Sequence, residues 1–158
     1  HVAADDAALT KVGGQGGVGK AVVFGMLERG GDLVTEVVAD RRSGTLLPLI
    51  RENVIRHSII HTDELRAYGG LSTMGYYHEQ VNHSIDQYVS PTGSSVNSIE
   101  GFWRHLKSSI SGTHIWVSPK HLGKYAKEFE YRYNRREAAH TMFPELVSTF
   151  QPLMPKSR

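Results

Sequence analysis

The sequence contains no cysteine, which excludes disulfides and thiolate metal sites. It has no apolar run close to the roughly 20 residues that span a bilayer, so no membrane partner is expected. The start of the chain also lacks the basic and then apolar stretch of a signal peptide. With 158 residues of ordinary composition, the chain is long enough to bury the core of one domain.

The formal net charge is only +2, but the charged residues are unevenly distributed. Residues 1–100 carry 8 Lys/Arg against 12 Asp/Glu, whereas residues 101–136 carry 8 Lys/Arg against 2 Asp/Glu. An acidic part followed by a basic part is typical of an enzyme that acts on a polyanion. The alternative is a basic helical surface without a partner.

Two familiar kinds of site are excluded by their own requirements. Residues 14–21 nearly spell a phosphate-binding P-loop, but Ala21 replaces the Mg²⁺-binding Ser/Thr. The residues that follow predict a β-hairpin, whereas a P-loop must open a helix. The nine histidines include no His-Glu-x-x-His motif and no compact cluster, which argues against zinc. Of these histidines, His61 and His83 are expected to line an acidic crevice.

The apolar pattern predicts an α/β domain with a mixed sheet flanked by helices. The hairpin turn at Gly30 and Gly31 indicates an antiparallel three-strand opening, and the later alternation indicates a parallel continuation. The expected strands are residues 1–12, 22–27, 33–38, 59–62 and 76–82. The expected helices are residues 45–53 with Ser43 as cap, 64–68, 97–110, 119–136 with Ser118 as cap, and a short one near the end. We expect one domain over residues 1–143 and a C-terminal tail over residues 144–158.

The helix expected at residues 97–110 has two distinct faces. An apolar stripe is formed by Ile99, Phe102, Trp103, Leu106 and Ile110, and a polar face by Asn97, Glu100, Arg104 and Lys107. A carboxylate at Glu100 suits a metal ion, and an ammonium at Lys107 suits the phosphate strand being cut. The alternative is an ordinary solvated face.

Other acidic residues lie upstream of this helix. Asp63 follows the short strand at 59–62, where a carboxylate points into a crevice or caps a helix. Asp5 and Asp6 lie in the weakly predicted first strand, and their alternative is a solvated terminus.

The helix expected at residues 119–136 combines an aromatic stripe with basic faces. The stripe of Tyr125, Phe129 and Tyr133 is most simply core. The basic residues could contact phosphates; they are Lys120, Lys124, Lys127, Arg132, Arg135 and Arg136.

Several segments together resemble a family of bacterial insertion-sequence transposases that is related to the eukaryotic Merlin elements. The resemblance rests on residues 61–68, 81–84, 97–103 and 117–122, continues through 18–20 and 129–136, and covers roughly residues 2–143. It implies a ribonuclease-H-like fold with a DDE triad of metal-binding acids. By position, Asp63 matches the second acid and Glu100 the third, with 36 residues between them.

The remaining positions follow the same resemblance. Asp5 matches the first acid, Asn97 is a rival to Glu100 for the third position, and Lys107 matches a basic residue of the family. The chain departs from the family at residues 6–8, where Asp-Ala-Ala replaces the usual Glu-Thr-Tyr. The residues expected to bind DNA are Arg104, Lys107, Lys120, Lys124, Arg135 and Arg136.

The resemblance also implies a function. Asp5, Asp63 and Glu100 would hold two Mg²⁺ or Mn²⁺ ions for DNA strand cleavage and strand transfer. The implied partners are transposon ends and target DNA, with a homo-oligomer on DNA, and the implied location is the bacterial cytoplasm near the nucleoid. The altered residues after Asp5 favour an alternative, a catalytically impaired relic that only binds nucleic acid or a protein partner. A related nuclease without strand transfer is the third possibility.

Overall fold

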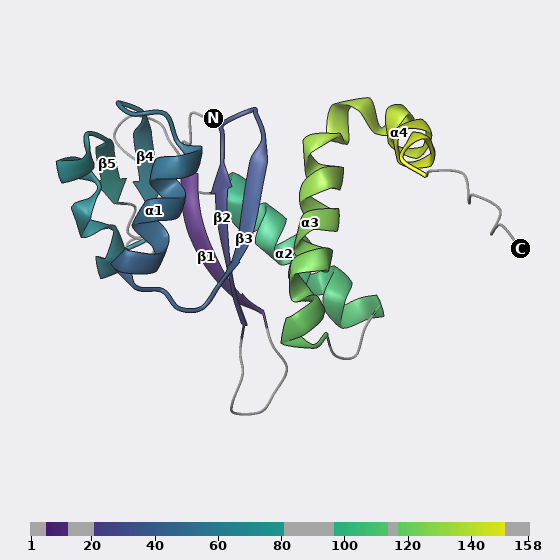
Figure 1. Cartoon of the computed structure of the whole chain (residues 1–158), viewed down its shortest axis with the longest axis horizontal. Coiled ribbons are helices and arrows are strands. Elements are labelled where there is room, and N and C mark those ends of the chain that lie inside the picture. Colours follow the sequence, from purple (N-terminus) through teal and green to yellow (C-terminus); the bar gives the residue numbers. More distant parts are fainter. Residues whose placement is uncertain (1–5, 13–20, 81–96, 114–116, 151–158) are drawn as a thin grey trace, which may run out of the picture.

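One mixed sheet forms the centre of the fold (Figure 1). The computed structural model describes residues 6–12, 21–80, 97–113 and 117–150, and within them the strand order is β3-β2-β1-β4-β5. The antiparallel strands are β1 (Asp6–Val12), β2 (Ala21–Leu27) and β3 (Leu33–Val38). The parallel strands are β4 (Ile59–Thr62), which pairs with β1, and β5 (Tyr77–Gln80), which pairs with β4. The expected antiparallel opening and parallel continuation are therefore parts of one sheet that share β1.

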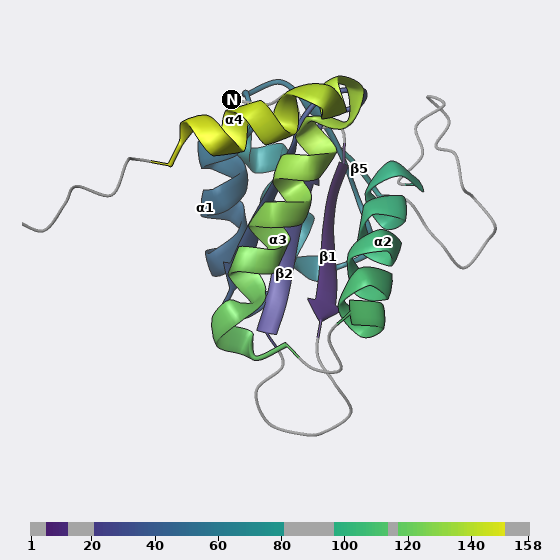
Figure 2. The same ribbon diagram turned by 90° about the vertical axis from the view of Figure 1, so that its right-hand side faces the viewer.

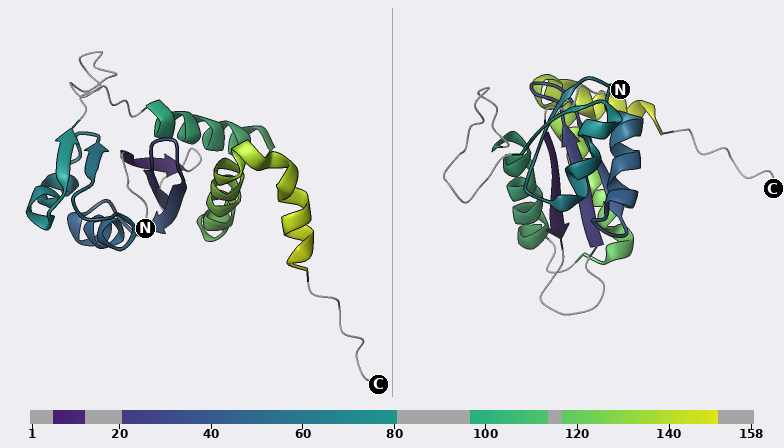
Figure 3. Two further views of the ribbon diagram at one scale, coloured as in Figure 1. Left: turned by 90° about the horizontal axis from the view of Figure 1, so that it is seen from above. Right: turned by 90° about the vertical axis from the view of Figure 1, so that its left-hand side faces the viewer.

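Helices cover both faces of this sheet. α1 (Ser43–Asn53) lies on one face, and α2 (Asn97–Thr113) and α3 (Pro119–Asn134) lie on the other (Figures 1 and 3). The short helix α4 (Met142–Ser148) follows α3. Along β2, alternate side chains serve the two layers: Phe24 packs towards α1 and Val23 towards α2 and α3. None of the helices in the described segments combines the length and the hydropathy needed to cross a bilayer.

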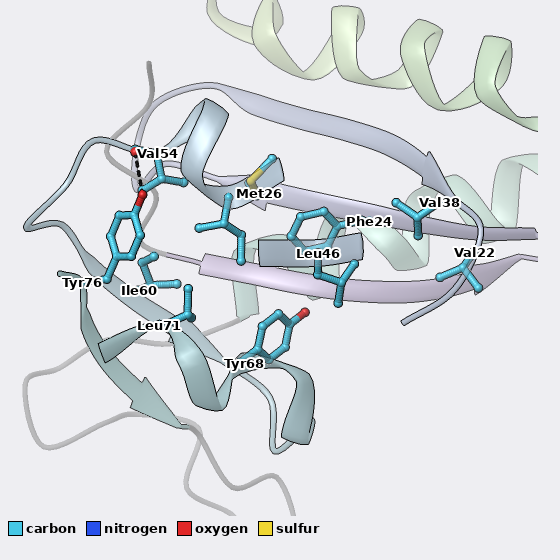
Figure 4. Close-up of a cluster of buried hydrophobic side chains, with 11 residues drawn as sticks. Val22, Phe24, Met26, Val38, Leu46, Val54, Ile60, Tyr68, Leu71 and Tyr76 are labelled. Carbon is cyan, nitrogen blue, oxygen red and sulfur yellow. Dashed lines mark hydrogen bonds between the residues drawn. The ribbon is translucent and has the colours of Figure 1, made fainter. Parts of the chain in front are cut away.

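The core on the α1 face joins the sheet to the connection that follows β4 (Figure 4). Of the residues that the apolar pattern turns inward on α1, Leu46 and Ile50 are fully buried and Leu47 is partly buried. Across this core, the Tyr76 hydroxyl donates a hydrogen bond to the Val54 carbonyl at 3.1 Å. Packing on this side fixes where β4 ends and therefore where Asp63 lies.

Two local predictions were wrong at helix starts. Ser43 is the first residue of α1 and not its cap, since Arg42 holds the cap position without a side-chain bond. Asp40, which precedes the helix, bonds to its first turn instead: Asp40 Oδ1 accepts hydrogen bonds from the Arg42 N–H at 2.9 Å and from Thr45 Oγ1 at 2.7 Å. The helix expected at residues 64–68 is a 3₁₀ helix at Arg66–Gly70, because Leu65 is extended, with φ −66° and ψ 122°.

α3 protects the outer edge of the sheet. β3 is an edge strand, and an edge with free N–H and C=O groups invites pairing with another chain. Asn134 accepts from the Leu33 N–H at 2.8 Å and donates to the Leu33 carbonyl at 2.9 Å. One turn earlier, Glu130 Oε2 accepts from both the N–H and the hydroxyl of Thr35 at 2.6 Å. Two side chains of α3 thus satisfy backbone groups that have no neighbouring strand.

Replacing Asn134 with alanine is expected to lower the free energy of unfolding by about 2–4 kcal/mol. Leu33 is fully buried, and each buried polar group left unsatisfied costs roughly 1–3 kcal/mol. Urea unfolding would measure the change. Glu128→Ala is the matched control on the same helix, because Glu128 makes only an exposed ion pair with Arg132 worth about 0.3–0.5 kcal/mol. Equal effects of the two substitutions would contradict the role of Asn134.

α4 continues the contacts of α3. Glu145 of α4 accepts hydrogen bonds from Arg135 Nε at 2.9 Å and from the Tyr131 hydroxyl at 3.0 Å. The expected boundary between residues 143 and 144 falls inside this helix. Phe143, Leu146 and Val147 of α4 nevertheless remain 76%, 49% and 49% exposed, so α4 adds little to the core.

Candidate active site

Asp63 is held at the carboxyl end of β4 by short-range bonds. Its Oδ1 accepts from the Leu65 N–H at 3.2 Å, and its own carbonyl accepts from Thr62 Oγ1 at 2.9 Å. Thr62 Oγ1 also lies 2.8 Å from His78 Nε2, on β5. Because the Thr62 hydroxyl has one hydrogen and donates it to the carbonyl, His78 must donate from Nε2. The bonds leave the second carboxylate oxygen of Asp63 without a partner within the described residues.

Tyr68 is a buried neighbour whose pKa responds to the charge of Asp63. The nearby Tyr68 hydroxyl is buried and has no hydrogen-bond partner among the described residues. Burial raises the pKa of Tyr68 well above its usual value, and the Asp63 carboxylate raises this pKa further. A carboxylate oxygen that has no partner among the described residues is suited to accept a cation.

Two residues of β5 border this site, and neither was predicted from the sequence. Glu79 lies opposite His61 in the sheet, and its Oε2 is 3.4 Å from His61 Nδ1. His61 is buried, so one of the two expected crevice histidines contacts an acid, whereas His83 lies outside the described residues. His78, next to Glu79, supports Thr62 as described above. Their sequence position could have identified these residues. They lie in the strand that follows β4, and neighbouring parallel strands run in the same direction, so their carboxyl ends lie at the same end of the sheet.

His78 makes stability depend on pH. Burial lowers the pKa of His78, and the neighbouring His61 lowers it further. Below the ordinary value of about 6.5, the unfolded chain therefore binds a proton that the folded chain does not. Stability is expected to be complete above pH 6.5 and to fall as the pH drops below it. Urea unfolding at pH 7.5, 6.5 and 5.5 should show a flatter profile for His78→Gln than for the wild type. Parallel profiles would contradict this assignment.

Glu100 lies in the first turn of α2 and is half-buried. Its helix is fixed by the apolar residues on either side of it, because Ile99 is fully buried and Trp103 is 5% exposed. Trp103 packs directly onto Gly25 of β2, where a Cβ would lie 2.5 Å from Trp103 Cζ2. The rival ligand Asn97 is the first residue of α2, and its side chain lies outside the described part of the structure.

The elements that carry the predicted acids meet at one end of the sheet. The first residue of β1, Asp6, pairs with His61, two residues before Asp63. α2 packs along β1, and Figure 2 shows that both elements begin at the same end. Asp5 lies outside the described residues. Within them no three His, Cys, Asp or Glu residues gather closely enough to hold a metal ion. The complete triad therefore stays a prediction.

The predicted DNA-binding residues divide into two groups. Four have exposed side chains and make no ion pair with another described residue: Arg104 and Lys107 on α2, and Lys120 and Lys124 on α3. The other two hold the end of α3, since Arg135 bonds Glu145 and Arg136 donates to the Gly31 carbonyl at 3.2 Å. Lys127, which also carried a predicted phosphate contact, bridges Glu36 and Glu130 instead.

These features define a class of protein. The structure is similar to the catalytic core domain of BIV integrase, with a TM-score of 0.52 over 92% of this chain and 97% of that chain. At 14% sequence identity this likeness shows the fold, which is that of ribonuclease-H-like catalytic cores, as the sequence predicted.

The sequence identifies the particular family. Residues 3–134 match the ISXO2-like transposase domain, and the chain belongs to this family of insertion-sequence transposases. It is also 36% identical to an uncharacterized transposase-like protein of Haemophilus influenzae over 103 residues, which are 65% of this chain and 81% of that protein. The family expected from the sequence motifs is confirmed.

Proposed function

We propose that this chain is a DDE transposase catalytic domain, which cuts DNA at the ends of an insertion sequence and joins them to a target. The observation that carries the proposal is the placement of Asp63. Asp63 follows β4 beside the start of β1, and one of its carboxylate oxygens has no partner among the described residues, in a chain of the ISXO2-like transposase family. Glu100 begins the helix that packs along β1.

The donors present fit a hard divalent cation. Asp63 and Glu100 offer carboxylate oxygens, which Mg²⁺ and Mn²⁺ prefer, and the buried Tyr68 hydroxyl beside Asp63 offers no positive charge. Asp5 is the proposed first ligand, with Asn97 as rival to Glu100. When bound, a pair of such ions supplies a more acidic water and stabilisation of charge on the phosphate oxygens.

The side chains of this domain have separate tasks in the proposed reaction. Leu65 and Thr62 orient Asp63, and α2 fixes the place of Glu100. Arg104 and Lys107, exposed further along α2, would bind the phosphates on either side of the scissile bond. A water oxygen attacks the phosphorus, the bond to the 3′ oxygen breaks, and a 3′-hydroxyl is released. That hydroxyl then attacks a phosphodiester of the target and expels another 3′ oxygen.

The proposed partners are DNA and further copies of the same chain, because two element ends must be cut and joined together. The proposed location is the bacterial cytoplasm, close to the nucleoid. Residues 6–8 support one alternative, a catalytically impaired relative that only binds nucleic acid or a protein. They read Asp-Ala-Ala where related transposases carry Glu-Thr-Tyr.

The proposal is tested by two measurements on the full chain. Calorimetric titration with Mn²⁺ should give saturable binding, and a labelled DNA 3′-end should become joined to a plasmid only when Mn²⁺ or Mg²⁺ is present. DNA binding without metal binding or joining would instead support the impaired relative. Metal-dependent cutting without joining would support a nuclease. If the chain bound neither DNA nor metal, all three functions would be refuted.

A further inference from the structure

The apolar face of α4 is turned towards solvent. Phe143, Leu146, Val147 and Phe150 recur at the spacing i, i+3, i+4 and i+7, which places them on one side of a helix. Phe150 lies just beyond α4, but its N–H still bonds to the Val147 carbonyl at 3.2 Å, so the turn continues to it. All four side chains are exposed, and the two phenylalanines are 76% and 78% exposed. A surface helix of a globular protein normally turns such a face towards the core.

Polar contacts on the opposite side of α4 hold it in this orientation. Glu145 accepts hydrogen bonds from Arg135 Nε at 2.9 Å, from the Tyr131 hydroxyl at 3.0 Å and from Thr141 Oγ1 at 2.9 Å. These bonds tie the polar side of α4 to α3 and to the turn between the two helices. Figures 1 and 3 show α4 projecting from the end of α3, away from the sheet. The outward apolar face is therefore a fixed feature of the fold.

The same chain has an open apolar cavity of about 460 Å³ between α2 and α3. Four rings line this α2–α3 cavity: Phe102 and His105 from α2, and Phe129 and Tyr133 from α3. No residue of α4 is among the described residues that line it. In Figure 2, α4 extends from α3 towards the side away from α2, so the helix does not reach the cavity of its own chain.

The α2–α3 cavity lies on the flank of α2 that is opposite the predicted catalytic residues. Successive residues of a helix are about 100° apart, so Gly101 and His105 point away from the side that carries Glu100 and Arg104. A protein segment bound in the cavity would therefore leave the catalytic side of α2 open to DNA.

The area that can be buried decides what covers the apolar face of α4. A fully buried phenylalanine contributes roughly 200 Å², so the four exposed side chains offer about 450 Å² in each chain. Two such faces packed on each other would bury roughly 900 Å² in total, which is below the ~1,200 Å² of a stable interface. If each face entered the α2–α3 cavity of another chain, both faces and both cavity walls would be covered, and roughly 1,800 Å² would be buried.

We propose that two copies of the chain associate by placing α4 of each copy in the α2–α3 cavity of the other. The same pair of surfaces is used twice, which gives a closed two-fold dimer. This interface goes beyond the proposed function, which requires more than one copy of the chain but does not specify the surface through which the copies meet. The association needs neither DNA nor metal, so it can be tested without either.

The lack of cysteine in the sequence permits a crosslinking test on the full chain. One protein carries Val147→Cys on α4, and a second, tagged protein carries Arg132→Cys at the cavity, where the side chain is 62% exposed. Under oxidising conditions the mixture should give a disulfide-linked pair of one tagged and one untagged chain. Neither protein alone should give a crosslinked pair.

Sedimentation velocity without DNA or metal measures the strength of the association. Phe143→Ser should raise the dissociation constant of the dimer roughly thirtyfold or more, the effect of losing one aromatic anchor of an interface. The fold should be unaffected, because Phe143 is already exposed. Ile55→Ser is the matched control, since Ile55 is 52% exposed and lies just after α1, outside both surfaces. It should leave the dissociation constant unchanged.

Each other outcome overturns the inference. Crosslinking of Val147→Cys to itself would show that α4 pairs with α4. A disulfide within one monomeric chain that carries both cysteines would show that α4 folds onto its own cavity. A wild-type chain that stays monomeric at the highest soluble concentration, or a dimer that Phe143→Ser leaves unchanged, would refute the interface. All of these results leave the proposed function standing, because that function is tested by metal binding and DNA joining.

Discussion

Replacing Asp63 with asparagine is expected to reduce DNA joining by a factor of about 10³ or more. A bound divalent metal supplies several kcal/mol of transition-state stabilisation, and each ~1.4 kcal/mol corresponds to about a tenfold change in rate. Asparagine keeps Oδ1, so the bond from the Leu65 N–H remains possible and the backbone after β4 should keep its path. The loss should therefore appear in chemistry and in Mn²⁺ affinity, and not in stability.

The measurement compares joining rate, Mn²⁺ affinity and urea unfolding for the same set of proteins. Glu64→Gln is the matched control, because Glu64 is the next residue in the chain and is exposed. It should behave like the wild type in all three assays. If Asp63→Asn joined DNA at the wild-type rate, Asp63 would not belong to the active site and the proposed mechanism would be wrong.

The first acid of the triad is tested in the same assays. Asp5 is the residue implied by the family pattern, while Asp6 begins β1 at the position opposite His61. Asp5→Asn and Asp6→Asn should therefore differ, and the variant that loses Mn²⁺ binding identifies the ligand. If both retain full binding, the site holds its metal without an acid from β1, which would favour the impaired relative.

The elements with a strong local pattern were predictable from the sequence. β2, β3 and β4 follow apolar runs between turns, and the stripe Ile99, Phe102, Trp103 and Leu106 gives α2 within a few residues. Phe129 and Tyr133 of the predicted aromatic stripe likewise pack against the core beneath α3, whereas Tyr125 is not part of that core and Ala126, which was not predicted, is. In these segments the buried residues recur on one face, so the apolar periodicity of the sequence is enough to predict the element.

Features that depend on distant partners were not predictable. At the start of α1 the cap position falls on Arg42, which makes no side-chain cap bond, and Asp40 binds the Arg42 N–H and the Thr45 hydroxyl from outside the helix. Asn134 reaches Leu33 across 101 positions, and His78 reaches Thr62 across 16. No single-sequence pattern encodes such pairs. The site is similar: family resemblance selects Asp63 and Glu100, whereas only the fold brings Tyr68 near Asp63 and His78 to Thr62.

Gly25→Ala is expected to damage both stability and activity, although Gly25 touches no predicted catalytic residue. The glycine lets α2 approach the sheet, since a Cβ here would lie 2.5 Å from Trp103 Cζ2 and 2.9 Å from Trp103 Cη2. Overpacking a core typically costs about 1–3 kcal/mol. Relief requires the first half of α2 to move away, and Glu100 lies between Ile99 and Trp103 on that half. A displacement of about 1 Å can reduce a rate by about 10².

A compensating substitution makes this prediction specific. The two crowded atoms belong to the outer six-membered ring of the indole, which phenylalanine lacks in that position, so Trp103→Phe should restore much of the stability and activity of Gly25→Ala. Urea unfolding and joining rates of the two single variants and the double variant form the cycle. Gly112→Ala is the control on α2, where a Cβ meets nothing within 4 Å and a gain in stability is expected. Additive effects in the cycle would show that contact with Trp103 does not set the position of α2, and Glu100 would then have to be placed by other contacts.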